Sequence, residues 1–221
     1  MKELKVLGIS DSTKRAMRMS RQALVDQGYE LVDVEFTEKE IDDSFKYFYN
    51  TLVNELAPQV LLDFVSEAET LDRGTKEFMR IVESGPFMKK VFAWLARKTN
   101  QGRVANLIPH YNLQTGTQRE HFNEERYKFC HKMVEKWQSF NIEAMLAPVF
   151  PHCAFSDKNA GDMATMTHYC LIWNILNFPT GSVPVTTVRE EEQTFTDSYN
   201  DKWTEMIRET CESSAGMPIG V

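Results

Sequence analysis

The first forty residues alternate between hydrophobic and polar positions in a way that predicts a strand, a helix and a second strand. Apolar residues crowd positions 4–9, which favours a first strand. A helix is expected over about 11–27, with Gly28 where a helix commonly ends. At 30–36, apolar and charged residues alternate strictly, as in a strand with one polar face. This order with short connections is typical of a parallel βαβ unit, so the expected fold class is α/β.

The rest of the pattern predicts mainly helices. A capping box formed by Thr37 and Glu40 begins a second helix, which Pro58 interrupts. The elements expected after it are a helical section at 59–83 broken near Gly74, helices at 86–98, 118–140, 163–177 and 198–211, and strands at 144–149, 182–188 and 217–221. No repeat or low-complexity linker divides the chain, so residues 1–221 are expected to form a single domain.

The amino-acid composition argues against several classes of function. The 221 residues include 25 Lys and Arg against 32 Asp and Glu, for a net charge of −7. This balance argues against a nucleic-acid partner, because such proteins carry a net basic surface. The four Cys have no short paired spacing, so we expect reduced thiols in a cytoplasmic protein rather than a zinc site or a disulfide framework. No stretch approaches the roughly 20 apolar residues of a membrane-spanning helix.

Residues 85–109 reverse the charge locally, because they hold five basic residues and no acidic one. On a helix, their large apolar side chains would share one side, and Lys89, Lys90 and Arg97 would lie on the other. Two interpretations stay open: a surface helix packed on the core, and an interfacial helix resting on a membrane. The residues expected to contact a membrane in the second interpretation are Phe87, Val91, Phe92, Trp94 and Leu95.

No catalytic motif stands out among the residues themselves. The five His show no spacing suited to a metal site. His152 and Cys153 are neighbours in sequence, but this does not give a nucleophile and its base the required geometry. Ser213 and Ser214 come just before Gly216 at the end of a predicted helix, and a helix stop explains them most simply.

The segment 141–188 carries a specific family resemblance. A strand with two prolines after it, a loop with a glycine, an apolar helix and an aromatic-Pro-x-Gly-x-x-Pro-Val-Thr-x-Val run follow one another in register. The positions are Pro148, Pro151, Gly161, Asn174, Phe178, Pro179, Gly181, Pro184, Val185, Thr186, Thr187 and Val188. The segment resembles the C-terminal half of amidase-signature hydrolases, most closely the fatty acid amide hydrolases of animals. Segments at 4–9, 30–36 and 214–221 extend the resemblance over nearly the whole chain.

The resemblance implies a partial amidase fold, with a mixed, mostly parallel sheet flanked by helices. It also implies hydrolysis of the C–N bond of long-chain acyl amides by a serine nucleophile, without a cofactor or metal. The catalytic Ser, Ser and Lys of the family lie upstream of the matched region, so no catalytic residue is assigned here and the chain alone is expected to be inactive. In the family, the helix before the aromatic-Pro-x-Gly turn lines the acyl channel. The matching substrate-binding positions are Cys170, Ile172, Trp173 and Phe178.

Three function hypotheses follow, the third and weakest being an independent lipid-binding module. In the first, the chain is part of a fatty acid amide hydrolase-like enzyme and supplies its substrate channel and, at 86–98, its membrane cap. The partners would then be an acyl-amide lipid and the surface of an intracellular membrane. In the second, the chain is a catalytically dead relic that serves as a structural subunit, pairing open sheet edges with a second copy or another chain. The first and last residues fall within predicted strands, so we expect the chain to lack flanking segments, and under the first hypothesis it would come from a truncated or split gene.

Overall fold

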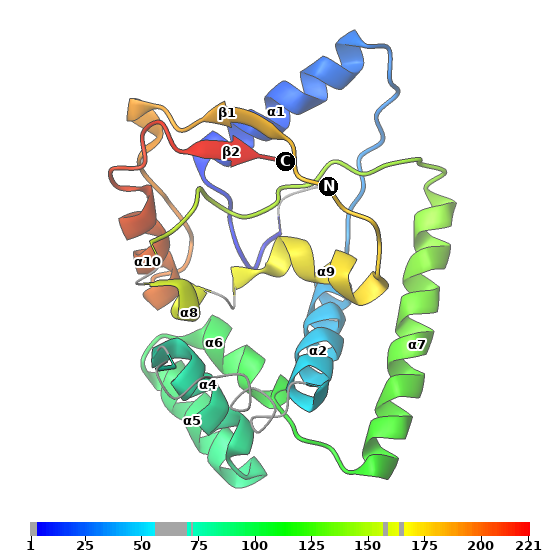
Figure 1. Ribbon diagram of the computed structural model, residues 1–221, viewed down its shortest axis with the longest axis vertical. Coiled ribbons are helices and arrows are strands. Elements are labelled where there is room, and N and C mark those ends of the chain that lie inside the picture. The colour runs from blue at the N-terminus through cyan, green and yellow to red at the C-terminus, as the bar shows by residue number, and fades with distance from the viewer. Residues whose placement is uncertain (1–3, 56–69, 72, 157–158, 164–165) are drawn as a thin grey trace.

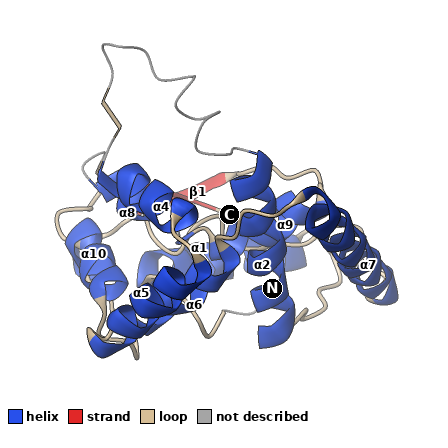
Figure 2. Ribbon diagram, turned by 90° about the horizontal axis from the view of Figure 1, so that it is seen from below, coloured by secondary structure: helices blue, strands red, loops and turns tan. Residues whose placement is uncertain are grey.

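The computed structural model describes residues 4–55, 70–71, 73–156, 159–163 and 166–221, which form a mainly helical structure (Figure 1). The elements are α1 (Asp11–Asp26), α2 (Glu38–Glu55), α4 (Arg73–Glu83), α5 (Pro86–Lys98), α6 (Gly102–Leu107), η1 (Ile108–His110), α7 (Gly116–Ser139), α8 (Ala160–Met163), α9 (His168–Leu176), β1 (Pro184–Thr187), η4 (Glu190–Glu192), α10 (Lys202–Cys211) and β2 (Pro218–Gly220). In Figure 1, α1 lies beside the two strands at one end, whereas α4, α5 and α6 gather at the opposite end. Helix α7 runs along one side, as the turned view also shows (Figure 2).

Short sequence signals set the ends of the first two helices. Ser10 Oγ accepts a hydrogen bond from the backbone N–H of Thr13, and Gly28 adopts a φ of 85° just past the end of α1. The capping box predicted for α2 is confirmed. Thr37 Oγ1 accepts from the N–H of Glu40 at 3.2 Å, and Glu40 Oε2 accepts from the N–H of Thr37 at 2.8 Å. These contacts satisfy N–H groups that have no partner inside the helix.

The sheet formed by the described residues has two antiparallel strands. β1 pairs with β2 so that Pro184 faces Gly220 and Thr187 faces Pro218. The predicted strands at 182–188 and 217–221 are therefore confirmed. Arg15 of α1 joins the helix to this sheet, because it donates to Thr186 Oγ1 at 2.6 Å and to the carboxylate of Glu192 at 2.6 and 2.8 Å.

The mostly parallel sheet expected from the sequence is not confirmed. Residues 4–7 form a turn with a single Leu4–Leu7 bridge, while 30–36 and 144–149 run as loops. The hydroxyl of Tyr169 accepts from the N–H of Leu4 at 3.1 Å and donates to the carbonyl of Leu7 at 2.7 Å, so it takes the place of a neighbouring strand. Alternation predicts a strand where another strand completes the ladder. Among the residues described, these three segments have no such neighbour.

Two predicted helices differ from those observed. Most of the first part of the expected 59–83 helix lies outside the described residues, and α4 begins at Arg73. Gly74 lies in the first turn of α4, and residues 70–71 just before this helix are not helical, in keeping with the break expected near Gly74. A Cβ added there would lie 2.6 Å from the carbonyl carbon of Gly161, so the glycine allows α4 and α8 to approach closely. The expected 163–177 helix is represented by α9 and the end of α8, with residues 164–165 outside the description.

The main hydrophobic core lies where α2 packs against α9 and α7. Phe45 of α2 contacts the ring of His168 with centroids 4.0 Å apart. Tyr47, also on α2, packs against Phe129 and Phe122 of α7 at 5.0 and 5.4 Å. Burial of these rings supplies apolar area, which is the dominant favourable term in folding. α2 therefore has its aromatic side chains in the centre of the structure.

A buried ion pair connects α6 with the start of α10. The Arg103 side chain is 3% exposed and donates to Asp201 Oδ2 at 2.7 Å, Asp197 Oδ2 at 3.0 Å and Thr204 Oγ1 at 2.7 Å. Asp201 also caps α10 by accepting from the N–H of Thr204 at 3.0 Å. Burial alone would raise the pKa of Asp201, but the hydrogen bonds from Arg103 and Thr204 outweigh it and hold that pKa below its usual value. The pair therefore stays charged inside the protein.

We expect Arg103→Met to lower the free energy of unfolding by about 3–5 kcal/mol, because it leaves two carboxylates buried without their cation. Urea unfolding followed by circular dichroism measures the change. Arg97→Met is the matched control, since Arg97 is exposed and donates to Asn106 at the surface. The control should change stability by less than about 0.5 kcal/mol. If both substitutions changed the free energy of unfolding equally, the buried ion pair of Arg103 would not stabilise the fold more than a surface contact does.

Candidate functional site

A mainly apolar cavity of about 730 Å³ lies between the end of α7, the segment 143–149 and α9 with the turn after it. The residues that line it are Trp137, 143–149, Tyr169, Cys170, Trp173, Asn174, 178–183 and Val221. This volume is within the usual range for small-molecule sites, which are concave and largely apolar. Glu143 is the single charged residue in this lining. The cavity is therefore suited to a hydrophobic ligand.

Three aromatic rings form one wall of this apolar cavity. Asn177 takes a left-handed conformation, with φ of 53°, and ends α9. The N–H of Phe178 then donates to the carbonyl of Trp173 at 3.1 Å, so the chain turns back over the helix. The Phe178 ring lies 6.4 Å from Trp173 and stacks on it, and it meets Trp137 of α7 edge-on at 5.1 Å. The turn after α9 thus builds the wall.

Cys170 connects α9 to the segment 143–149 on the opposite wall of the apolar cavity. Its thiol donates to the carbonyl of Val149 at 2.8 Å. Burial raises the pKa of the Cys170 thiol above its usual value, so the sulfur keeps its proton at neutral pH. A protonated, hydrogen-bonded thiol is a poor nucleophile, and Cys170 is suited to lining the cavity rather than to covalent chemistry.

The structure brings together three of the four residues predicted to bind substrate. Cys170, Trp173 and Phe178 line the apolar cavity, whereas Ile172 is 1% exposed and packs in the core. Residues 170 and 173 are neighbours on a helix surface, but position 172 lies about 200° around the axis from position 170. Trp137 was not predicted to line the cavity, although it belongs to the apolar stripe of the long helix. Its position depends on how α7 packs against α9.

Helix α5 turns large apolar side chains outward. Phe87 is 74% exposed, Trp94 56% and Leu95 46%. Of the other residues predicted to contact a membrane, Val91 is half-buried, and Phe92 is half-buried against the small cluster that α5 forms with α6 and η1. Three of the five residues predicted to contact a membrane are therefore exposed.

The prediction that Lys89 lies on an exposed basic face of α5 is wrong, because Lys89 is buried. Its ammonium group donates to the carbonyls of Val82 and Tyr111 and to Asn112 Oδ1. Burial lowers the pKa of Lys89 from its usual value. Position 89 lies about 200° around the helix from position 87, so these bonds fix the rotation that points Phe87 outward.

The described residues hold no pair suited to nucleophilic catalysis at the positions that the sequence singled out. His152 Nδ1 lies 2.7 Å from the carbonyl oxygen of Cys153, and burial lowers the pKa of His152 to about 4. The Cys153 thiol donates to the carbonyl of Thr210 at 3.9 Å, and burial raises the pKa of this thiol above its usual value. Ser213 has φ of 60°, and Ser214 Oγ donates to the carbonyl of Cys211, as expected of a helix stop.

Within the described ranges, no three His, Cys, Asp or Glu side chains are grouped so that they could hold a metal ion. In the same part of the chain, none of the helices has the length and apolar character needed to cross a membrane.

Comparison with known proteins gives the family. The sequence profile of one family, the amidases, matches residues 1–221. This chain belongs to the amidase family. Its relatives include "Fatty-acid amide hydrolase 1" of Sus scrofa, which is 24% identical over 160 residues, and "Fatty acid amide hydrolase 1" of Caenorhabditis elegans, which is 30% identical over 84 residues. The resemblance to fatty acid amide hydrolases is therefore confirmed, and the α/β class is supported at the level of the family.

The amidase chain matches a limited part of these relatives. The alignment with the pig protein covers 70% of this chain and 27% of the relative. The alignment with the nematode protein covers 37% of this chain and 15% of the relative. The matched region thus spans about a quarter of the pig protein or less than a fifth of the nematode protein.

We expect Lys89→Met to lower the free energy of unfolding by about 1–3 kcal/mol, because it leaves buried acceptors without a donor. Lys90→Met is the matched control, since Lys90 is the exposed neighbour on α5. It should change stability by less than about 0.5 kcal/mol. Urea unfolding of both variants provides the measurement. If both substitutions have the same small effect, Lys89 does not hold α5 in place.

Proposed function

We propose that this chain provides the acyl-binding pocket of a fatty acid amide hydrolase-like serine amidase. The complete enzyme would cleave the C–N bond of long-chain acyl amides. The observation that carries the proposal is the apolar cavity lined by Cys170, Trp173 and Phe178, on the helix and turn that bear the amidase sequence pattern. The names of the two relatives support the class of substrate.

An acyl chain suits this cavity for a physical reason. Each methylene group removed from water contributes roughly 0.8 kcal/mol, so a long chain gains affinity from apolar walls alone. The rings of Trp137, Trp173 and Phe178 supply such walls and are held rigidly by contact with one another. Rigid walls reduce the entropy lost on binding.

The proposal assigns the nucleophile to another part of the enzyme. Thr180 and Ser182 are the aliphatic hydroxyl residues that line the apolar cavity, and the hydroxyl of Tyr169, also in the lining, donates to the carbonyl of Leu7. Neither Thr180 nor Ser182 is hydrogen bonded to a Lys, His or carboxylate side chain within the described portion of the chain. A serine needs an adjacent base to attack an amide. We therefore propose that the chain alone binds acyl amides without hydrolysing them.

We also propose that α5 rests on a membrane surface through Phe87, Trp94 and Leu95. These exposed side chains share the helix with the exposed basic residues Lys90 and Arg97. Aromatic and aliphatic groups beside basic groups are typical of interfacial helices, which insert shallowly and attract anionic lipids. The protein would then be peripheral on a membrane that contains its substrate.

A test of the acyl pocket uses a brominated long-chain acyl amide, which should quench the fluorescence of Trp137 and Trp173. Cys170→Phe fills the cavity and should weaken binding about tenfold or more, because the added ring displaces the chain. Ser139→Phe, at the exposed end of α7, adds the same ring outside the cavity and should leave binding unchanged. Unchanged quenching in Cys170→Phe would contradict the pocket, and absent quenching in the wild type would favour the relic hypothesis.

A test of the membrane face combines Phe87→Ser, Trp94→Ser and Leu95→Ser. The triple variant should bind anionic vesicles about tenfold or more weakly, because it removes the apolar groups that would insert. Vesicle co-sedimentation measures the partition. Tyr127→Ser is the control, since Tyr127 is 71% exposed on α7. Vesicle binding that survives the triple substitution would rule out α5 as the contact.

A further inference from the structure

The charge that lines the apolar cavity has one sign. Glu143 is negatively charged, and no Lys, Arg or His of the described residues belongs to the lining. The carboxylate of Glu143 is exposed and forms no ion pair with another described residue. Lys136, which precedes Trp137 on α7, lies outside the lining and pairs with Glu40 of α2 at 2.5 Å. Within the described part of the chain, the negative charge of the cavity is therefore not balanced.

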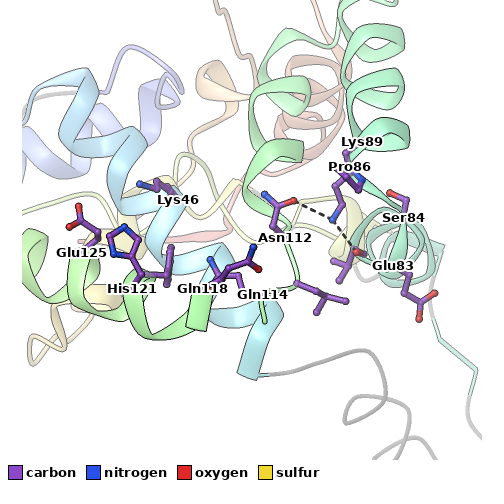
Figure 3. A pocket seen from close by; sticks show the side chains of 13 residues that line it. Lys46, Glu83, Ser84, Pro86, Lys89, Asn112, Gln114, Gln118, His121 and Glu125 are labelled. Carbon is purple, nitrogen blue, oxygen red and sulfur yellow. Dashed lines mark hydrogen bonds between the residues drawn. The ribbon is translucent and has the colours of Figure 1, made fainter. Parts of the chain in front are cut away.

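Another cavity of this protein carries both signs of charge. It lies beside the α4–α5 junction and the first turns of α7, as Figure 3 shows. Its lining includes Lys46, Lys89, Glu83 and Glu125. Opposite charges in one lining offset each other's effect on a charged ligand. The apolar cavity differs from this one because a ligand there meets charge of a single sign.

Two helix ends add partial negative charge to the apolar cavity. Trp137 lies in the last turn of α7, whereas Trp173 and Asn174 lie in the last turn of α9, and all three line the cavity. The C-terminal end of a helix carries a partial negative charge, which favours a nearby cation and disfavours an anion. No Asp, Glu, Lys or Arg occurs in α9 to offset this charge. The helix ends and Glu143 therefore act in the same direction.

The aromatic wall favours the same kind of ligand. The rings of Trp137, Trp173 and Phe178 contact one another, with centroids 5.1, 6.3 and 6.4 Å apart. The face of an aromatic ring is electron-rich, so it attracts a cation and repels an anion. In a cleft with apolar walls, charges of one sign also act on a ligand more strongly than they do on an open surface.

We propose that Glu143 makes the apolar cavity selective for the charge of the head group on an acyl ligand. Long-chain acyl amides with a neutral or cationic amine part bind, and those with an anionic amine part are disfavoured. The free fatty acid belongs to the disfavoured class, because its carboxyl group is ionised near neutral pH. This inference rests on the acyl pocket proposed above and adds the sign of charge that the pocket accepts.

Such selectivity separates the substrate of an amidase from its product. Hydrolysis adds water across the C–N bond, so that a neutral acyl amide gives an amine and a fatty acid. The fatty acid then releases its proton to solvent and becomes an anion. The anion meets the carboxylate of Glu143 and the two helix ends, whereas the amide did not carry a charge for them to repel. Product release is favoured for this reason.

Three ligands with the same brominated acyl chain test the inference through quenching of tryptophan fluorescence. They are the primary amide, the mono-amide of ethylenediamine, which is cationic, and the fatty acid, each below its micelle concentration near neutral pH. The cationic ligand should bind at least as tightly as the primary amide, and the fatty acid should bind about tenfold more weakly. Added salt should reduce this difference, because salt screens charge and leaves the apolar contacts in place.

Variants of Glu143 separate its charge from the general cost of burying an anion. Glu143→Gln should bring the affinity for the fatty acid within about threefold of that for the primary amide, and Glu143→Lys should make the fatty acid the tighter ligand. Glu83→Gln is the matched control, since Glu83 is an exposed glutamate outside the apolar cavity. It removes the same net charge and should leave the ratio unchanged.

Two kinds of failure can be told apart. If the wild type binds the fatty acid as tightly as the primary amide, or if both Glu143 variants keep the wild-type ratio, the charge selectivity is overturned and the acyl pocket stands. If none of the three ligands quenches the fluorescence, the acyl pocket itself is contradicted, and the selectivity that rests on it falls too.

Discussion

The arrangement of the helices depends first on one buried cation, Arg103. Its guanidinium lies against the rings of Tyr199 and Trp203, at 4.2 and 5.3 Å, while its N–H groups are taken up by Asp201 and Asp197. It also donates to the carbonyl of Val6 at 3.3 Å, so one side chain joins α6, the start of α10 and the turn near the N-terminal end of the described chain. A charge this far from water persists because its geometry and its hydrogen bonds are complete.

Two buried cations position helices α5 and α6. Arg103 fixes where α6 lies, and Lys89 fixes how α5 is rotated beside it. Without the contacts of Lys89, nothing in the amphipathic pattern of α5 would force Phe87 outward, because apolar residues occur on more than one side of that helix. Helix α7 contributes to two cavities, because His121 near its start lines a cavity beside the α4–α5 junction and Trp137 near its end lines the apolar cavity.

Three buried titratable groups have pKa values far from neutral pH. Burial lowers the pKa of His168 to about 3, with the nearby Arg103 adding to the effect, and raises the pKa of Tyr49 and of Cys211 to about 12. General acids and bases work best with a pKa near the operating pH. Groups locked in their uncharged form instead keep the interior apolar.

The sequence by itself determined the local features of this protein. Helix positions, the Thr37–Glu40 capping box and the left-handed Gly28 follow from neighbouring residues, and the amidase pattern at 141–188 identified the family. It could not determine pairing between distant segments. Apolar and charged residues do alternate at 30–36, but the strand predicted from this alternation is wrong. The hydrogen bonds that make a strand come from another part of the chain. Likewise, Lys89 is polar in any helical pattern, and tertiary structure alone surrounds it with carbonyl oxygens. Which of Cys170, Ile172 and Trp173 face the apolar cavity depends on the packing of α9 against α2, since a helix that is apolar all round does not reveal its buried side.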